Sequence, residues 1–155
     1  MLGNLKILAV LALSLAALAG CASTPQASRQ RDAEAKQFRP HPATSAIYIY
    51  RTDRQAPDSE STDIYVDGRL IGATLQQSFF RVNVNPGVHV LNGMGPDQGS
   101  LRMETRPGEI YFIELKVVGS NSHFIIVDPE IARQTTIACC ALMENWAPGQ
   151  RPLLR

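Results

Sequence analysis

The chain has 155 residues, of which 45% are hydrophobic and 19% are charged, and its formal net charge is +1. Fifteen basic residues against fourteen acidic ones leave no excess of positive charge for binding phosphates, so we expect no nucleic-acid partner. Ten prolines and eleven glycines lie between short β-branched and aromatic runs, which favours an all-β domain with many turns over a helical one.

Residues 1–20 have the layout of an export signal. Lys6 and the amino terminus form a small positive region, and an apolar run from Ile7 to Ala19 follows, interrupted only by Ser14. As a helix this run would be about 20 Å long, which is less than the roughly 30 Å hydrocarbon core of a bilayer. We therefore predict a cleaved signal peptide rather than a permanent membrane span.

Leu18, Ala19 and Gly20 directly precede Cys21, and this tetrapeptide resembles the lipobox of bacterial lipoproteins. In that class the cysteine receives a diacylglyceryl group and an amide-linked acyl chain such as palmitate, and it becomes the first mature residue. Two or more acyl chains make membrane attachment stable. Ala22, in place of Asp, implies sorting to the outer membrane, so the resemblance implies a periplasm-facing protein held by membrane lipid. The alternative is an ordinary signal peptide that is cut elsewhere.

The mature chain predicts a lipidated tether, one folded domain and a tail. Residues 21–44 are mostly small or polar, so we expect a disordered tether with a span of roughly 25 Å, in which a short helix over residues 32–36 would be marginal. Residues 45–147 should form the β-sandwich domain and residues 148–155 a loose C-terminal tail.

Alternating apolar and polar residues predict the strands of this domain. Residues 46–51 are β-branched or aromatic on both faces, so we expect a central strand there. Residues 80–84 alternate as a half-buried strand does. With similar runs farther along, the pattern predicts about seven or eight short strands in an antiparallel, immunoglobulin-like sandwich.

Three dipeptides mark the predicted turns. Asp67-Gly68 between two apolar runs predicts a type I′ hairpin, because that turn needs positive φ at both central residues. Pro86-Gly87 and Pro107-Gly108 predict two further turns. A turn role therefore explains Asp67 better than a catalytic one.

The C-terminal segment admits two interpretations. Asp128-Pro129-Glu130 has the features of a helix start, and residues 131, 135, 138, 142 and 146 would then lie on one helical face. Residues 134–142 would also suit a last strand. We favour a short C-terminal helix.

Several of these segments together resemble an uncharacterised lipoprotein family of Gram-negative bacteria whose domain has no assigned function. The middle portion is also similar to PEGA domains, which are small immunoglobulin-like or transthyretin-like β modules with the motifs V-D-G, I-G and P-G-x-H. The resemblance implies the fold and brings no catalytic residues with it. It is carried by residues 46–51, 65–68, 71–72, 86–89 and 107–113.

The residues that could carry chemistry form no recognisable motif. His41, His89 and His123 have no metal-site spacing, and we expect a structural or cross-strand role for His89. Cys139 and Cys140 are a possible thiol site. A bridge between adjacent cysteines would be strained, so the favoured interpretation is two small packed side chains, and the second is a bridge to another chain.

We therefore expect a membrane-anchored envelope lipoprotein that acts as a noncatalytic binding or structural module. We expect no cofactor and no metal, and we expect an envelope protein or polysaccharide as partner. The rival functions are an envelope hydrolase acting on peptidoglycan, which needs a cleft lined by convergent polar groups, and a surface-exposed adhesin.

Overall fold

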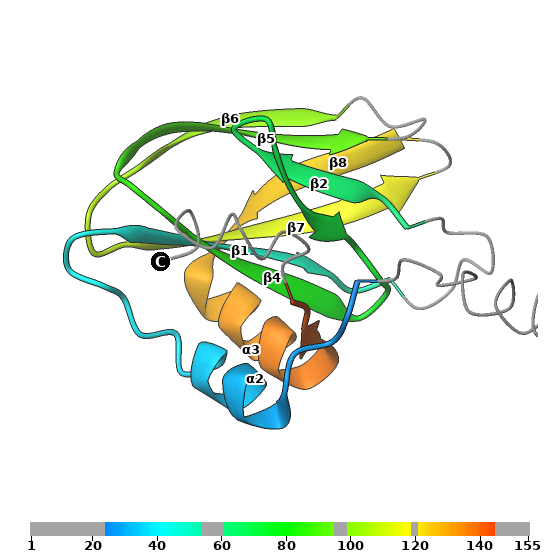
Figure 1. The fold of residues 1–155 in the computed structure, drawn as a ribbon, viewed down its shortest axis with the longest axis horizontal. Coiled ribbons are helices and arrows are strands. Elements are labelled where there is room, and N and C mark those ends of the chain that lie inside the picture. Colours follow the sequence, from blue (N-terminus) through cyan, green and yellow to red (C-terminus); the bar gives the residue numbers. More distant parts are fainter. Residues whose placement is uncertain (1–23, 54–60, 95–98, 119–120, 145–155) are drawn as a thin grey trace, which may run out of the picture.

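The computed structural model describes residues 24–53, 61–94, 99–118 and 121–144. The predicted signal peptide, the lipobox residues Leu18 to Gly20, Cys21 and the tail at 148–155 lie outside the described residues. Within them, nine strands form two sheets and two short helices lie against one of the sheets (Figure 1). The expected all-β sandwich with a short C-terminal helix is confirmed.

The larger sheet has five strands in the order β8-β7-β1-β4-β9, and the smaller has four in the order β3-β2-β5-β6. The strands of the larger sheet are β1 (Ser45–Arg51), β4 (Ser78–Val84), β7 (Ile110–Val118), β8 (Asn121–Val127) and β9 (Ala141–Leu142). Those of the smaller sheet are β2 (Asp63–Val66), β3 (Arg69–Ala73), β5 (Gly87–Met94) and β6 (Ser100–Thr105).

β1 is the middle strand of the larger sheet, and all seven of its residues are buried. It pairs with β4 in antiparallel fashion and with β7 in parallel, and β9 is also parallel to β4. The expectation of a wholly antiparallel sandwich is therefore wrong for the larger sheet. The chain reaches β7 from the smaller sheet, so β7 joins β1 without a hairpin and its direction is not set by a tight turn.

Apolar side chains from both sheets form the core between them. Phe80, Val82 and Val84 of β4 point into this core, whereas Arg81 and Asn83 are only partly buried, as the alternation predicts. Ile47 and Ile49 of β1 lie opposite side chains of the smaller sheet. The buried residues of the smaller sheet in this cluster are Ile64, Val66, Ile71, Leu91 and Met103.

The other face of the larger sheet is covered by α2 (Arg29–Ala35) and α3 (Pro129–Cys139), which lie below it in Figure 1. Tyr48 is fully buried at the centre of this second core, and its ring packs against Phe38, Phe79 and Phe112. Its hydroxyl donates a hydrogen bond to the carbonyl of Ala35 at 2.7 Å. The molecule therefore has three layers, with the larger sheet in the middle.

α2 corrects the expectation of a disordered tether, because residues 24–38 belong to the folded domain. Ser28 caps the helix by accepting a hydrogen bond from the N–H of Arg31. Ala35 and Phe38 are buried against the sheet. A seven-residue helix is marginal alone, so contacts with the sheet stabilise it.

α3 begins where the sequence predicts, since the carboxylate of Asp128 accepts hydrogen bonds from the N–H groups of Glu130 and Ile131. The predicted buried face is wrong. Ala132 and Thr136 face the sheet, and Ile131 is 60% exposed. The helix ends at Cys139, so Leu142 lies in β9 instead, while residue 146 lies outside the described residues. Small residues face inward because α3 packs closely on the aromatic side chains of the sheet.

The two ends of the described chain meet beside the larger sheet. Gln26 forms an isolated antiparallel bridge with Met143, the Ala27 N–H donates to the carbonyl of Leu142, and the Glu144 N–H donates to that of Pro25. Thr24 is buried and exchanges hydrogen bonds with the backbone of Ala73 at 2.9 Å. The first residue described is therefore part of the fold.

Neither helix that the structure describes is long and apolar enough to cross a bilayer.

Candidate ligand-binding pocket

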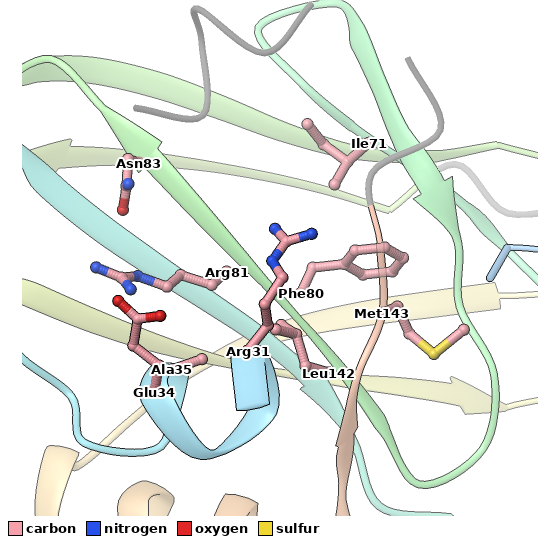
Figure 2. Close-up of a pocket in the computed structure, with 9 residues that line it drawn as sticks. All are labelled: Arg31, Glu34, Ala35, Ile71, Phe80, Arg81, Asn83, Leu142 and Met143. Carbon is pink, nitrogen blue, oxygen red and sulfur yellow. The ribbon is translucent and has the colours of Figure 1, made fainter. Parts of the chain in front are cut away.

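A cavity of about 260 Å³ opens beside β4, on the side away from β1. α2 forms one wall, β3 another, and the strand after α3 closes one end (Figure 2). Its volume lies just below the roughly 300–1,000 Å³ that is usual for sites of drug-sized ligands. The lining residues are Arg31, Glu34, Ala35, Ile71, Phe80, Arg81, Asn83, Leu142 and Met143.

The α2 wall is fixed by contacts with the strand after α3. The carboxylate of Asp32 accepts a hydrogen bond from the Leu142 N–H at 2.8 Å and pairs with Lys36 at 2.9 Å. Arg31 forms an ion pair with Glu144, in which one guanidinium nitrogen donates to both carboxylate oxygens. The pocket wall is thus built from segments more than 100 positions apart in the chain, which no local motif could reveal.

The β4 wall presents Arg81 and Asn83, which alternate with the core residues of the strand. The guanidinium carbon of Arg81 lies 6.0 Å from the centre of the Tyr48 ring. Burial raises the pKa of Tyr48, and the positive charges of Arg81 and Arg133 lower it by smaller amounts. Arg81 therefore lies over the face of the Tyr48 ring and also lines the pocket.

Asp67 and His89, two of the residues singled out in the sequence, meet far from this pocket. Asp67 and Gly68 have φ of 52° and 74° and form the two-residue turn between β2 and β3. The Asp67 carboxylate lies 2.7 Å from Nδ1 of His89, and Nε2 of His89 lies 2.8 Å from the carbonyl of Asn85. Both ring nitrogens are engaged within the protein, so neither is left to act as a general base.

The remaining predicted residues are not brought together into a site. Pro86 lies between β4 and β5, Gly87 is the first residue of β5, and Pro107 and Gly108 form the turn between β6 and β7. The other two histidines, His41 and His123, are exposed. Among the residues described, no three His, Cys, Asp or Glu side chains are grouped so that they could hold a metal ion.

Cys139 and Cys140 form a disulfide with each other, and their Cα atoms are 3.7 Å apart. The expectation of two unbridged side chains is corrected, and both thiols are used within one chain. The bond forms where α3 ends and the backbone becomes extended at Cys140, with φ of −120° and ψ of 145°. Cys140 is nevertheless buried in the core beneath the helices, as a small apolar residue would be.

The fold and the pocket define a small β-sandwich module with a helical layer on one face. Residues 42–129 match the family described as "Protein of unknown function (DUF2846)", and the chain belongs to this family. The expected membership of a family without assigned function is thereby confirmed.

An uncharacterised protein of Haemophilus influenzae (strain ATCC 51907 / DSM 11121 / KW20 / Rd) is 35% identical to this chain over 98 residues. The match covers 62% of this chain and 58% of that protein, so the chain spans less than two thirds of its relative. No solved structure matches.

The pocket is only partly built from the segment that matches the family. Arg81, Asn83, Phe80 and Ile71 lie inside it, whereas the α2 wall and the strand after α3 lie outside. The sequence analysis missed this site. The available signal was the pair of polar residues, Arg81 and Asn83, that alternates with the core residues of β4.

Proposed function

We propose that this chain is a lipid-anchored envelope protein of Gram-negative bacteria that acts as a noncatalytic binding module on the periplasmic face of the outer membrane. The lipobox resemblance at residues 18–21 supports the anchor. The observation that carries the binding role is the pocket beside β4, whose polar lining consists of two arginines, a glutamate and an asparagine. These groups recognise charge and hydrogen-bonding partners, and they include no nucleophile paired with a base.

The folded residues 24–38 change how such an anchor would hold the domain. Two residues, and hence three residue-to-residue steps, separate Cys21 from the fixed position of Thr24, and these steps can span at most about 11 Å, at up to 3.6 Å each. The domain would therefore lie against the lipid headgroups instead of standing about 25 Å away.

The anchor is tested by Cys21→Ser in cells supplied with labelled palmitate. Serine lacks the thiol that accepts the diacylglyceryl group, so we expect the label to disappear and the precursor to accumulate. Unchanged labelling would refute the lipoprotein assignment. Protease treatment of intact cells is the companion test, because a periplasmic protein is protected and an adhesin is degraded.

The noncatalytic role is tested with the purified full chain and intact peptidoglycan sacculi. We expect the protein to release no soluble fragments, with or without added zinc. His89→Ala is the matched variant, since His89 is the histidine that contacts a carboxylate in the described part of the chain. Turnover that this change removes while the fold is retained would favour the hydrolase.

A further inference from the structure

Arg81 is a charged group whose hydrogen-bonding capacity the protein leaves unused. Its Nε is buried and has no hydrogen-bond partner, and none of the ion pairs among the described residues includes it. Its other described contact is the face of the Tyr48 ring. Buried donors are nearly always satisfied, so one that lines a cavity points to an acceptor supplied from outside the protein.

Arg31 on the opposite wall is different, because the Glu144 carboxylate already pairs with its positive charge through one guanidinium nitrogen. The positive charge that remains for a ligand is therefore that of Arg81. A guanidinium binds a carboxylate with two parallel hydrogen bonds, and that pairing is among the stronger polar interactions in proteins.

Glu34 supplies a negative charge across the same cavity. Figure 2 shows its carboxylate turned towards the Arg81 side chain, yet the two side chains form no ion pair with each other. The Arg81 guanidinium and the Glu34 carboxylate line the same cavity but do not pair with each other, which suits a ligand that carries both a negative and a positive charge.

The rest of the lining is apolar. Ile71, Phe80, Leu142 and Met143 are each buried, with between 2% and 6% of their surface exposed. A cavity of about 260 Å³ with these apolar residues in its wall has room for one small aliphatic group beside the charged groups. It is too small for a polymer chain.

We infer that this pocket binds a small zwitterion, namely a free α-amino acid with an aliphatic side chain. Its carboxylate pairs with Arg81, its ammonium group faces Glu34, and its side chain lies against the wall of Phe80 and Leu142. The inference rests on the proposed function only in treating the pocket as a binding site and not a catalytic one.

The test is isothermal titration calorimetry on the full chain, purified in detergent, with three probes of similar size. L-leucine carries both charges, 4-methylpentanoate carries the carboxylate alone, and L-leucinamide carries the ammonium group alone. We expect leucine to bind most tightly. Arg81→Gln should lower the affinity for leucine and for 4-methylpentanoate roughly ten- to hundredfold, which is the usual effect of losing a hydrogen bond to a charged group.

Glu34→Gln should lower the affinity for leucine towards that for 4-methylpentanoate. The affinity for 4-methylpentanoate itself should not change. Arg102→Gln is the control, because Arg102 is an exposed arginine in β6 of the other sheet. Should Arg81→Gln fail to fold, Arg81→Lys replaces it, since lysine keeps the charge but not the bidentate geometry.

Equal affinity of all three probes, absence of leucine binding, or binding that Arg81 variants leave unchanged would overturn the inference. Loss of the leucine signal with palmitate labelling at Cys21 intact and no release of peptidoglycan fragments would leave the anchored, noncatalytic role standing, so the two failures are distinguishable.

Discussion

Tyr50 is a buried phenol near the end of β1, and its ionisation should make the domain sensitive to alkali. Burial, with a smaller contribution from the Glu114 carboxylate, raises the pKa of Tyr50 to about 12. In the unfolded chain a tyrosine ionises near pH 10. Between these two values the folded state holds a proton that the unfolded state has lost, so the free energy of unfolding must fall as the pH rises from about 10 towards 12.

Urea unfolding at pH 9, 10 and 11 measures this effect. We expect the wild-type protein to lose stability over this range more steeply than Tyr50→Phe, which has no phenol to ionise. Spectrophotometric titration should show one fewer late-ionising tyrosine in the variant. Parallel curves for the two proteins would mean that Tyr50 is open to water.

At the scale of single elements, α2 and the turn after it should behave as part of the domain. Phe38 is buried, and its ring lies edge-on to Tyr48 and Phe112 at 5.1 and 5.4 Å. Phe38→Ala should therefore reduce the free energy of unfolding by about 3 to 5 kcal/mol. Gln37→Ala, at an exposed neighbouring position, is the control and should change it little. A disordered tether would make the two variants equally harmless.

The β2–β3 hairpin gives a second test at this scale. Gly68 has φ of 74°, and a Cβ placed there would meet no atom within 4 Å, so the backbone conformation alone decides the effect of a substitution. Gly68→Val should cost about 1 to 3 kcal/mol, the range for strained backbone positions. Arg69→Val puts the same side chain on the adjoining strand and serves as the control. A melting temperature for Gly68→Val within a degree of wild type would show that the turn tolerates a side chain.

Local patterns predicted the elements whose causes are local. The alternation of Phe80 to Val84, the positive-φ dipeptide at Asp67 and the capping residue Asp128 each act within a few residues, and the structure has a strand, a turn and a helix start there. The apolar faces on both sides of β1 also indicated a strand covered twice. The sequence did not reveal what covers the second face, because α2 contributes only Ala35 to it and the segment after the helix adds Phe38.

The parallel pairing of β1 with β7 and the pocket depend on contacts between distant segments. Arg31, Arg81 and Met143 come from three such segments, and each in isolation reads as an ordinary surface or core residue. Their proximity depends on the register of β9 against β4 and on the position at which α2 packs against the sheet. Neither is encoded by a spacing within the sequence, which is why the sequence analysis assigned none of these residues to a binding site.

At the scale of the whole molecule, the position of Thr24 predicts how far the domain stands from a bilayer. Neutron reflectivity of the lipidated full chain on a supported bilayer should find the protein layer in direct contact with the headgroups, because the linker spans at most about 11 Å. Inserting twelve Gly/Ser residues after Ala22 is the control and should produce a hydrated gap. A gap in the protein without the insertion would show that residues 24–38 detach from the sheet at the membrane.

The meeting of the chain ends also determines how the domain would bear mechanical load. A pull on the N-terminal end would first reach the hydrogen bonds between Thr24 and Ala73. It would then reach the bridge between Gln26 and Met143, the hydrogen bonds of Ala27 and Glu144, and the Arg31–Glu144 ion pair. These contacts couple the first described residues to the last, so the pull would pass into β9 and on to β4 rather than stripping β1 from its sheet. In the proposed envelope location, tension would therefore act first on the elements that line the pocket.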